Sequence, residues 1–499
     1  MNFHATKIIY LIMMEYIRLN LQYMVRNEKE CSYIVRKKQL IDEDVSDISE
    51  DITMVPSFIG YILTNIGKDG FESSVKAISS NLGVSSESII SFVKRITAAK
   101  PQRMKMLGSN IVLPQNILIN SHEKDEREYL TSPDFRATDR FVEKRPNSPI
   151  DINFMITTKC TTNCEYCYAK RDLQEKLSLT DIRNIIKQCY DIGVVNLALT
   201  GGDIFARQDW KEILSCSIAF GFHPFLSTKT LPKEKDIAFL NTLGISELQF
   251  SLDSLSPNVL STMIGKSSSY LNQVKEMFDM CSNKGIKLII RSVITKHNET
   301  LLNFKELYSF ISQYNNIYYW SITPAFLSEF KKEVVFRPSN QQLAEISIFV
   351  NSLSTSFPIY LNKINNDGYK LRKYDSVDDF VQNNQICHAN TYSMSILPSG
   401  ICTPCEMLYE NPDFILGNIQ KESIYNIWNS KKAWSLYMPE QKSMNNNDSP
   451  CVNCKVFDLC RKSVDKHICL VDISKTLGVG KGNYPDPRCP KSQAMNVIL

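Results

Sequence analysis

Three cysteines fall within eight residues near the middle of the chain, with the spacing Cys160-x3-Cys164-x2-Cys167. Thiolates this close on one short loop can each bind a different iron of the same iron–sulfur cluster. A [4Fe–4S] cluster ordinarily takes four cysteines, so three leave one iron open to an exogenous ligand. The alternative is a zinc knuckle, but structural zinc takes four closed ligands and no fourth is evident nearby. The spacing therefore favours an iron–sulfur cluster with one open corner.

A second group of cysteines crowds the C-terminal end, where glycine, proline and asparagine are frequent and long periodic runs are few. The chain holds 15 cysteines, and an odd count in a reducing compartment favours metal ligands over disulfides. Eight cysteines match two four-ligand sites, either of iron–sulfur clusters or of zinc ribbons. These candidate ligands are Cys387, Cys402, Cys405, Cys451, Cys454, Cys460, Cys469 and Cys489.

Alternating strand and helix patterns between residues 149 and 330 must position the central cysteines. Six mostly unbroken apolar strands, separated by amphipathic helices, predict an α/β fold with parallel pairing, a full or partial (β/α)6 TIM-like barrel. Catalytic groups of such barrels lie at the carboxyl ends of strands, and the cysteine loop directly follows the first strand. We expect Thr180 to cap the first helix. The predicted strands are 150–156, 194–199, 222–226, 247–251, 287–293 and 317–322.

The flanking segments predict further domains. Residues 1–115 form the N-terminal domain, in which a hairpin, three short amphipathic helices and a second hairpin at Gly108 predict a winged helix. We expect Ser85 or Ser86 to cap the third of these helices. Residues 116–148 are charged and contain prolines, which is typical of a linker. A mixed connector at 331–385 leads to the cysteine-rich domain at 386–499, which we expect to depend on metal clusters for its folding.

The central loop resembles the signature of the radical SAM superfamily, including the aromatic Tyr166 before the third cysteine. In that family S-adenosylmethionine (SAM) chelates the open iron of a [4Fe–4S] cluster and is cleaved to a 5′-deoxyadenosyl radical that abstracts a substrate hydrogen. Gly201, Gly202 and Asp203 resemble the GGE motif that holds the SAM amino group, with aspartate in place of glutamate. The resemblance also implies Ser227 and Ser251 as ribose ligands and Arg291 as the partner of the SAM carboxylate.

The C-terminal cysteines resemble the SPASM extension of radical SAM enzymes, which holds auxiliary [4Fe–4S] clusters. By this resemblance Cys451, Cys454, Cys460 and Cys489 hold one cluster, and Cys387, Cys405 and Cys469 hold the other, with Cys402 available as a fourth ligand or one iron open. The family has a further cysteine where this chain has Val464, which leaves the partition open. Glu406, directly after Cys405, matches an acidic residue that acts as a base in anaerobic sulfatase-maturing relatives.

Beside such an enzyme, the N-terminal domain resembles a PqqD-like recognition element, which binds the leader of a precursor peptide by adding it as a strand. The third predicted helix carries only Lys94 and Arg95 against Glu87, too little charge for DNA binding. The resemblance implies a peptide maturase that oxidatively cross-links a ribosomally made peptide through a thioether or a carbon–carbon bond, with an external electron donor such as flavodoxin or ferredoxin.

Composition limits the alternatives. Lys+Arg 57 minus Asp+Glu 53 gives a net charge of +4, which argues against a nucleic-acid partner. No apolar run approaches the ~20 residues of a membrane span, so we expect a cytoplasmic protein. Two other functions stay open: oxidation of a protein residue, as in sulfatase maturation, and redox sensing by an iron–sulfur DNA-binding regulator. A zinc-stabilised scaffold is a third.

Overall fold

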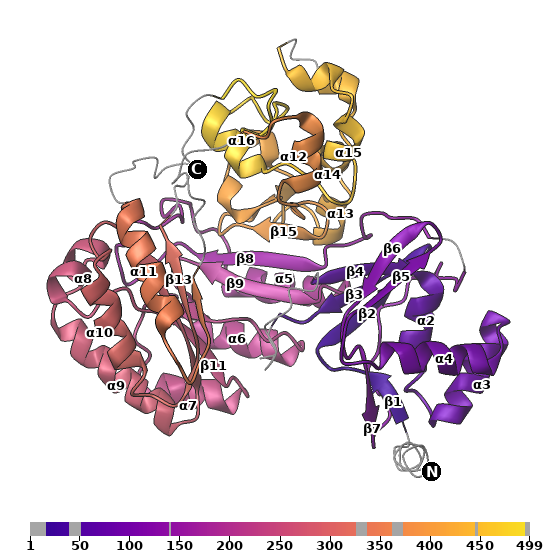
Figure 1. Cartoon of the computed structure of the whole chain (residues 1–499), viewed down its shortest axis with the longest axis horizontal. Helices are drawn as coiled ribbons and strands as arrows, with labels where there is room; N and C mark the ends of the chain where they lie inside the picture. Colours follow the sequence, from indigo (N-terminus) through magenta and orange to yellow (C-terminus); the bar gives the residue numbers. More distant parts are fainter. Residues whose placement is uncertain are drawn as a thin grey trace. The chain divides into compact units, whose positions relative to one another are not determined.

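The computed structural model describes residues 16–38, 51–138, 141–325, 337–361, 373–444 and 448–494. It divides into two compact units, Met1–Ile150 and Asp151–Leu499 (Figure 1). Residues 1–15 of the predicted N-terminal domain, and parts of the predicted linker and connector, lie outside the described residues. None of the described helices is long and apolar enough to cross a bilayer.

The first unit contains the predicted order of hairpin, three helices and hairpin. Strands β2 and β3 form the first hairpin, and β4, which the sequence did not predict, pairs with β3 to give the order β2-β3-β4. Strand β1 instead pairs with β7, inside the predicted linker. The strands are β1 (Tyr16–Leu19), β2 (Tyr23–Asn27), β3 (Cys31–Arg36), β4 (Ile52–Pro56), β5 (Gln102–Met106), β6 (Ser109–Leu113) and β7 (Leu118–Ser121); the helices are α2 (Ser57–Asn65), α3 (Phe71–Leu82) and α4 (Ser86–Ile96).

Local signals explain these elements. The Ser85 side chain accepts a hydrogen bond from Ser88 N and begins α4, as predicted. Gly83 ends α3 in the left-handed conformation that favours glycine. The second hairpin turns at Leu107 and Gly108, both with positive φ, which matches the twist of the flanking strands. The helices bury Ile59, Val75 and Val93 in one shared core.

The second unit is built on parallel strands, and all but one of the predicted strands occur near their predicted places. The exception is 222–226, where only the two-residue β10 follows at Ser227–Thr228. Parallel pairing joins β8 to β9, and joins β10 through β14 in order. The strands are β8 (Asp151–Thr157), β9 (Asn196–Gly201), β11 (Glu247–Ser251), β12 (Lys287–Ile294), β13 (Ile317–Pro324) and β14 (Ile359–Leu361).

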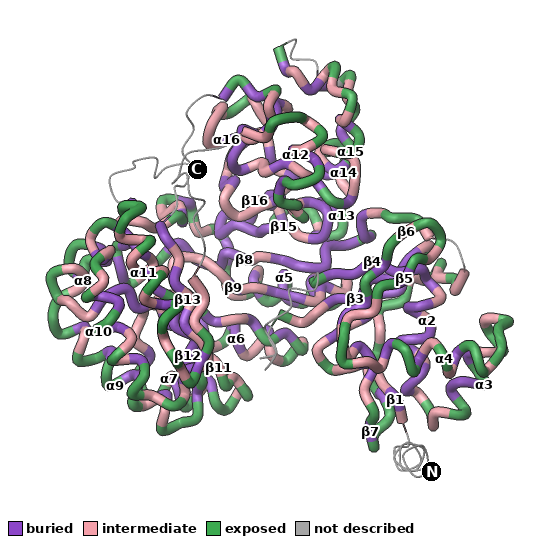
Figure 2. Tube along the Cα trace, viewed as in Figure 1, coloured by how far each residue is buried: buried purple, intermediate pink, exposed green. Residues whose placement is uncertain are grey.

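Helices follow the strands and cover one face of the sheet that β10 to β14 form, which is the second sheet of this unit (Figure 1). Ser178, not Thr180, caps the first of them, because its hydroxyl and the Asp181 carboxylate form a reciprocal capping box. Strand β8 is almost entirely buried, as Figure 2 shows, whereas β12 and β13 contain both buried and less buried residues. The helices are α5 (Leu179–Asp191), α6 (Trp210–Ala219), α7 (Glu234–Thr242), α8 (Pro257–Ile264), α9 (Ser269–Asn283), α10 (Leu301–Ile311) and α11 (Asn340–Ser352).

The cysteine-rich segment continues the first sheet of this unit. Strand β15 pairs in parallel with β8, and β16 and β17 follow antiparallel, giving the order β17-β16-β15-β8-β9. The sheet therefore crosses the predicted domain boundary at residue 386. The remaining elements are short, as the sequence predicts: β15 (Ser393–Ile396), β16 (Ile401–Thr403), β17 (Gly417–Asn418), α12 (Val377–Asn383), α13 (Ile424–Trp428), α14 (Lys431–Tyr437), α15 (Phe457–Arg461) and α16 (Leu470–Leu477).

Candidate active site and iron–sulfur centres

The loop that carries the central cysteines leaves the carboxyl end of β8. The Thr162 hydroxyl lies 3.3 Å from Cys160 Sγ and 3.4 Å from Cys164 Sγ, so these two thiols face the same hydroxyl. Arg171 Nη1 donates to the Thr162 carbonyl at 2.6 Å, which fixes the loop from the other side. Cys164 is buried, whereas Cys160 and Cys167 are half-buried. The loop therefore holds its thiols at an accessible strand end.

Neighbouring elements hold this loop in place. The Asn163 and Glu165 amides donate to carbonyls at the end of α8, at 3.0 and 2.9 Å. At the start of the loop, the Glu175 carboxylate accepts from the Thr157 hydroxyl and from both the amide and hydroxyl of Thr158. Burial alone would raise the pKa of Glu175, but these hydrogen bonds outweigh it and lower the pKa.

Gly201 and Gly202 are needed because the backbone at the end of β9 lies very close to the backbone at the start of the cysteine loop. The Gly202 amide donates to the Thr157 carbonyl at 2.9 Å. A Cβ at Gly201 would lie 2.3 Å from Thr157 O, and one at Gly202 would lie 2.1 Å from Lys159 O. Because neither contact is sterically possible, the two glycines let the end of β9 pack directly on the start of the cysteine loop.

Asp203 is buried and holds the loop after β10. Its Oδ2 atom accepts from the Thr228 hydroxyl at 2.7 Å and from both the amide and hydroxyl of Thr230 at 3.1 and 2.9 Å. The Lys229 and Phe205 amides donate as well, the latter to Oδ1. Four donors saturate Oδ2, whereas Oδ1 accepts one hydrogen bond and keeps acceptor capacity. The structure thus gives Asp203 a positioning role in addition to its predicted role as a SAM ligand.

Three predicted SAM-binding residues lie on one face of the second sheet, opposite the helices. The Cα register pairs Ser227 with Gln249, and Ser251 with Arg291. Gln249 links the row, because it accepts from the Ser227 hydroxyl at 2.6 Å and donates to the Ser251 hydroxyl at 2.9 Å. Arg291 is exposed, with its guanidinium 6.0 Å from the centre of the Phe225 ring. The row is a polar strip suited to a hydroxyl-rich ligand.

Tyr166 points from the cysteine loop to a buried carboxylate. Its hydroxyl donates to Asp253 Oδ2 at 2.5 Å, and Lys229 Nζ lies 2.9 Å from the same oxygen. The Val293 amide donates to Oδ1 at 2.8 Å. Burial, followed by the Asp253 charge, raises the pKa of Tyr166 well above its ordinary value, so the phenol stays protonated. This network ties the loop to the ends of β10, β11 and β12.

Glu406 lies against residues of the central loop and of β9. Its Oε2 accepts from the Thr200 hydroxyl at 3.1 Å, and its Oε1 accepts from the Tyr168 hydroxyl at 3.2 Å. Burial raises the pKa of Glu406, and the two hydrogen bonds oppose that rise. Tyr409 donates to the Tyr168 carbonyl at 2.6 Å. The predicted base therefore lies beside the cysteine loop and the end of β9, although 206 residues separate it from Thr200 in sequence.

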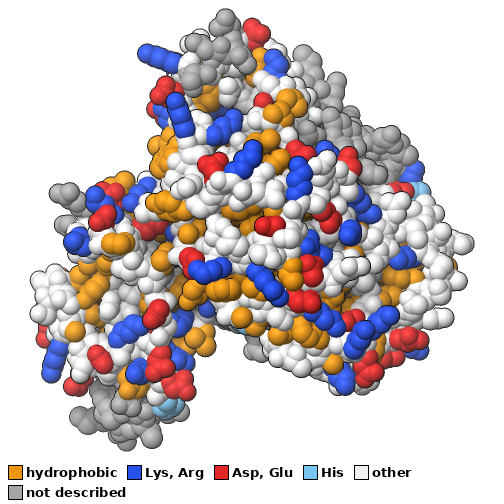
Figure 3. All heavy atoms as spheres, turned by 180° about the vertical axis from the view of Figure 1, so that it is seen from behind, with side chains coloured by type: hydrophobic (Ala, Val, Ile, Leu, Met, Phe, Trp, Pro, Cys, Tyr) orange, Lys and Arg blue, Asp and Glu red, His pale blue; other side chains and the backbone are white. Residues whose placement is uncertain are grey.

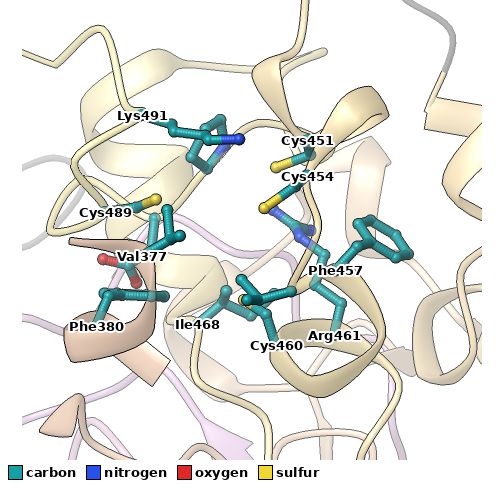
Figure 4. A pocket seen from close by; sticks show the side chains of 13 residues that line it. Val377, Phe380, Cys451, Cys454, Phe457, Cys460, Arg461, Ile468, Cys489 and Lys491 are labelled. Atoms are coloured by element: carbon teal, nitrogen blue, oxygen red, sulfur yellow. The ribbon is translucent and has the colours of Figure 1, made fainter. Parts of the chain in front are cut away.

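One predicted cluster site is assembled as a pocket. Cys451, Cys454, Cys460 and Cys489 all line it, and Figure 4 shows their thiols around one space. Arg461 and Lys491 line the same pocket. Burial raises the pKa of Cys460 to about 12 and Arg461 opposes the rise, so the metal must displace a firmly held proton.

The other predicted site gathers three cysteines. The thiol of Cys387 interacts electrostatically with those of Cys405 and Cys469, which places the three near one another. Cys402 does not join them. It is fully buried on β16 in the main apolar core, where it interacts with Cys189. Its placement does not support a ligand role and leaves three thiols at this site.

These residues fit iron–sulfur clusters. Arg461 is 4% exposed, and its Nε has no hydrogen-bond partner among the described residues, beside four thiols that become anionic when they bind iron. No three His, Cys, Asp or Glu side chains of the described chain converge as a single-ion site. Each cysteine of a cubane binds its own iron, so such convergence is not required. All fifteen cysteines, which all lie in described segments, are free thiols.

Several contacts of the site were not predicted. Gln249 stands out only as a polar residue in an apolar strand, and that signal was available in the sequence. Lys229, Thr200 and Tyr168 adjoin predicted motifs, but nothing in their spacing shows that they reach Asp253 or Glu406. Such contacts depend on loop conformation and not on periodicity.

Comparisons with known proteins agree with this arrangement. Residues 154–311 match the model of the radical SAM superfamily, and residues 387–455 match that of the SPASM iron–sulfur cluster-binding domain. The PqqA peptide cyclase of Gluconobacter oxydans (strain 621H) is 20% identical over 328 residues, 62% of this chain and 84% of the relative. That of Rhizobium meliloti (strain 1021) is 22% identical over 357 residues, 69% and 88% of the two chains.

Among solved structures, Streptococcus suis SuiB bound to the precursor peptide SuiA has a TM-score of 0.60 at 14% identity, covering 96% of this chain and 100% of that chain. SuiB bound to S-adenosylmethionine has a TM-score of 0.57 at 13% identity, covering 95% and 100%. At this identity the likeness shows the fold, which is an α/β radical SAM fold with a SPASM domain. Residues 154–311 are therefore a radical SAM domain and residues 387–455 a SPASM domain, and the protein is an enzyme whose cofactors are S-adenosylmethionine and [4Fe–4S] clusters.

Proposed function

We propose that this enzyme oxidatively cross-links a ribosomally synthesised precursor peptide, forming a thioether or a carbon–carbon bond. The observation that carries the proposal is the placement of Glu406, which follows a SPASM cysteine, against Thr200 at the end of β9. A base beside the radical site suits a reaction that removes a hydrogen atom, a proton and an electron from one substrate. The PqqA peptide cyclases and peptide-bound SuiB support a peptide as that substrate.

The strands of the second unit would form a partial (β/α)6 barrel whose mouth holds the reaction. When bound at Cys160, Cys164 and Cys167, the cluster and SAM supply a 5′-deoxyadenosyl radical. In our proposal the Arg291 guanidinium pairs with the SAM carboxylate, and the Ser227 and Ser251 hydroxyls bind the ribose. Tyr166, Gly201, Gly202 and Asp203 shape the pocket in which the SAM amino group binds.

Glu406 would accept the proton that leaves the substrate as the new bond forms. Its raised pKa, caused by burial, makes the carboxylate a stronger base than an exposed glutamate. The Tyr168 and Thr200 hydroxyls orient both oxygens. Cys451, Cys454, Cys460 and Cys489 would hold one auxiliary cluster, and Cys387, Cys405 and Cys469 the other. These clusters would supply the acceptor for the electron.

We further propose that the first unit is a PqqD-like winged helix that binds the peptide's leader along β4. The Arg36 amide bonds to the Asp51 carbonyl, so Thr53 and Val55 face β3 while the backbone groups of Ile52 and Met54 face outward. No described residue bonds to this outer edge of β4. An extended leader could add there as a further strand.

Anaerobically reconstituted enzyme tests the proposal when incubated with SAM, a one-electron reductant of the flavodoxin or ferredoxin class, and the small peptide encoded beside its gene. We expect the peptide to lose two mass units, with one equivalent of 5′-deoxyadenosine per cross-link. The Glu406→Gln variant is the matched control, since it should form 5′-deoxyadenosine with little product. Unchanged peptide with steady 5′-deoxyadenosine formation by the parental enzyme would contradict the proposal.

A further inference from the structure

The two groups of auxiliary cysteines lie in different electrostatic surroundings. Two cations line the pocket of Cys451, Cys454, Cys460 and Cys489, namely Arg461 and Lys491. Figure 4 shows both side chains at this pocket, among the thiols. Arg461 is almost completely buried and donates through Nη2 to the Tyr484 carbonyl, while its Nε–H has no partner among the described residues. A buried, partly unpaired guanidinium is costly unless an anion lies beside it.

Acidic and basic groups are balanced in the surroundings of the other three cysteines. The carboxylates of Glu406 and Asp472 act on Cys405, and that of Asp472 also acts on Cys469. Asp472 is neutralised by Arg488 at 2.6 Å and by Lys475 at 3.5 Å. A further cation, Lys466, acts on Cys387, but its ammonium is directed at the carbonyls of Tyr437, Arg461 and Ser463. No uncompensated arginine like Arg461 faces this group within the described segments.

A short polar bridge connects the two groups. Asp486 lines the four-cysteine pocket, and its Oδ2 accepts from the Cys469 amide at 2.8 Å. Its Oδ1 accepts from the Arg488 amide at 2.9 Å, and Arg488 directly precedes Cys489. Asp486 and Arg488 form an ion pair at 3.1 Å. The pair is charge-balanced and therefore does not cancel the contribution of Arg461 and Lys491.

Net charge, hydrogen bonds and burial set the reduction potential of an iron–sulfur cluster. A nearby cation stabilises the more negative, reduced state and so raises the potential. We propose that Arg461 and Lys491 hold the cluster of Cys451, Cys454, Cys460 and Cys489 at a higher potential than the cluster near Cys405. This inference rests on the proposed function for its purpose, which is to collect the electron that the substrate releases.

The electron balance is as follows. The peptide loses a hydrogen atom to the 5′-deoxyadenosyl radical, and then loses one proton and one electron as the cross-link forms. The proton would pass to Glu406. The cluster near Cys405 would supply the first acceptor for the electron, and the cluster beside Arg461 the second. A one-electron acceptor of the flavodoxin or ferredoxin class removes that electron. Arg461 and Lys491 are positioning residues here, because they touch neither substrate nor reacting atoms.

The test is a potentiometric EPR titration of the reconstituted full chain, in a background where Cys160, Cys164 and Cys167 are alanine. In this background the auxiliary clusters alone contribute signals. Cys454→Ala and Cys405→Ala assign each signal to its cluster. Arg461→Gln and Lys491→Gln remove one charge each, while Arg461→Lys and Lys491→Arg are matched controls that keep it. Lys491 is exposed, so its substitution should leave the fold intact even where Arg461→Gln loses iron.

We expect the signal lost in Cys454→Ala to have the higher potential in the background protein. It should shift to lower potential in Lys491→Gln and Arg461→Gln, and stay in place in both charge-keeping controls. An unchanged potential in Lys491→Gln at full iron content would overturn the proposal, and so would a reversed order of the two potentials. No peptide is present, so failure of cross-linking alone would count against the proposed function and not against this inference.

Discussion

The Thr200 hydroxyl donates a 3.1 Å hydrogen bond to Glu406 Oε2. This bond joins the carboxyl end of β9 to the residue that follows Cys405. Thr200 directly precedes Gly201 and Gly202, which pack on the cysteine loop. One contact therefore connects three motifs that are dispersed along the sequence. Because β15 also pairs with β8, the same sheet carries the radical SAM strands and the SPASM strands.

Glu406→Gln should lower cross-linked product by about 10²- to 10⁴-fold, since that is the usual contribution of a general base. SAM cleavage should persist, because the side chain does not contact the cysteine loop's thiols. Thr200→Val removes one hydrogen bond but keeps the carboxylate, so it should lower the amount of cross-linked product much less. The measurement is the ratio of product to 5′-deoxyadenosine. Equal losses of both in Glu406→Gln would show that Glu406 acts on SAM cleavage instead.

Asp203→Ala should destabilise the protein, because the half-buried Phe205 and Lys229 amides lose their acceptor. Each unsatisfied buried group costs about 1–3 kcal/mol. The melting temperature of the reconstituted protein should fall by several degrees, at about 2–4 °C per kcal/mol for a domain of this size. Asp203→Asn retains one acceptor oxygen, so its melting temperature should fall less. A raised KM for SAM without any thermal change would instead limit Asp203 to ligand binding.

Glu247, at the start of β11, should make stability depend on pH. Burial raises its pKa from 4.5 to about 7, although Lys287 opposes the rise. The folded state then binds more protons than the unfolded state between pH 4.5 and 7, so stability falls as pH rises through this window. Glu247→Gln should increase the free energy of unfolding by about 1–2 kcal/mol at pH 8, allowing for solvent screening, and change little at pH 4.

Chemical denaturation at the two pH values measures this effect. Glu234→Gln is the control, because the Glu234 side chain is exposed on α7. If Glu247→Gln increased the free energy of unfolding equally at pH 4 and pH 8, packing and not ionisation would distinguish glutamine from glutamate at this position.

Met54→Pro should weaken binding of a leader-containing precursor without unfolding β4, because proline removes an N–H that faces away from β3. Met54→Ala keeps the N–H and serves as the control. We expect KM for the full precursor to rise about tenfold or more in Met54→Pro, the loss of about 1.4 kcal/mol of binding. The KM for a leaderless core peptide should stay at its parental value. If both KM values were unaffected, the leader would not add to this edge.

The sequence predicted the features that arise from periodicity and from local capping. The β11 bounds, the Ser85 cap of α4 and the pairing of β2 with β3 all follow from such signals. Strand β4 escaped prediction because it is only five residues long, has mixed polarity and ends in Pro56. Thr180 was the wrong cap because Ser178, two residues earlier, has Asp181 at the position that completes a capping box.

For the site, residue types predicted the thiols but not their partition. Cys402 and Cys405 are three residues apart, yet alternation along β16 directs Cys402 into the apolar core while Cys405 begins the next turn. The same limit applies to Asp203, whose five donors come from residues 205 and 228–230. Spacing in sequence indicates which groups can do chemistry, whereas loop conformation decides which of them meet.

The central claim is that Cys160, Cys164 and Cys167 bind a cluster with one iron open to SAM. The most direct measurement is 5′-deoxyadenosine formation by oxygen-protected, reconstituted Cys164→Ala enzyme with SAM and reductant. Cys216→Ala is the matched control, since that thiol packs on α6 away from the loop. We predict that Cys164→Ala forms no 5′-deoxyadenosine above background while Cys216→Ala is unaffected; parental turnover by Cys164→Ala would contradict the account.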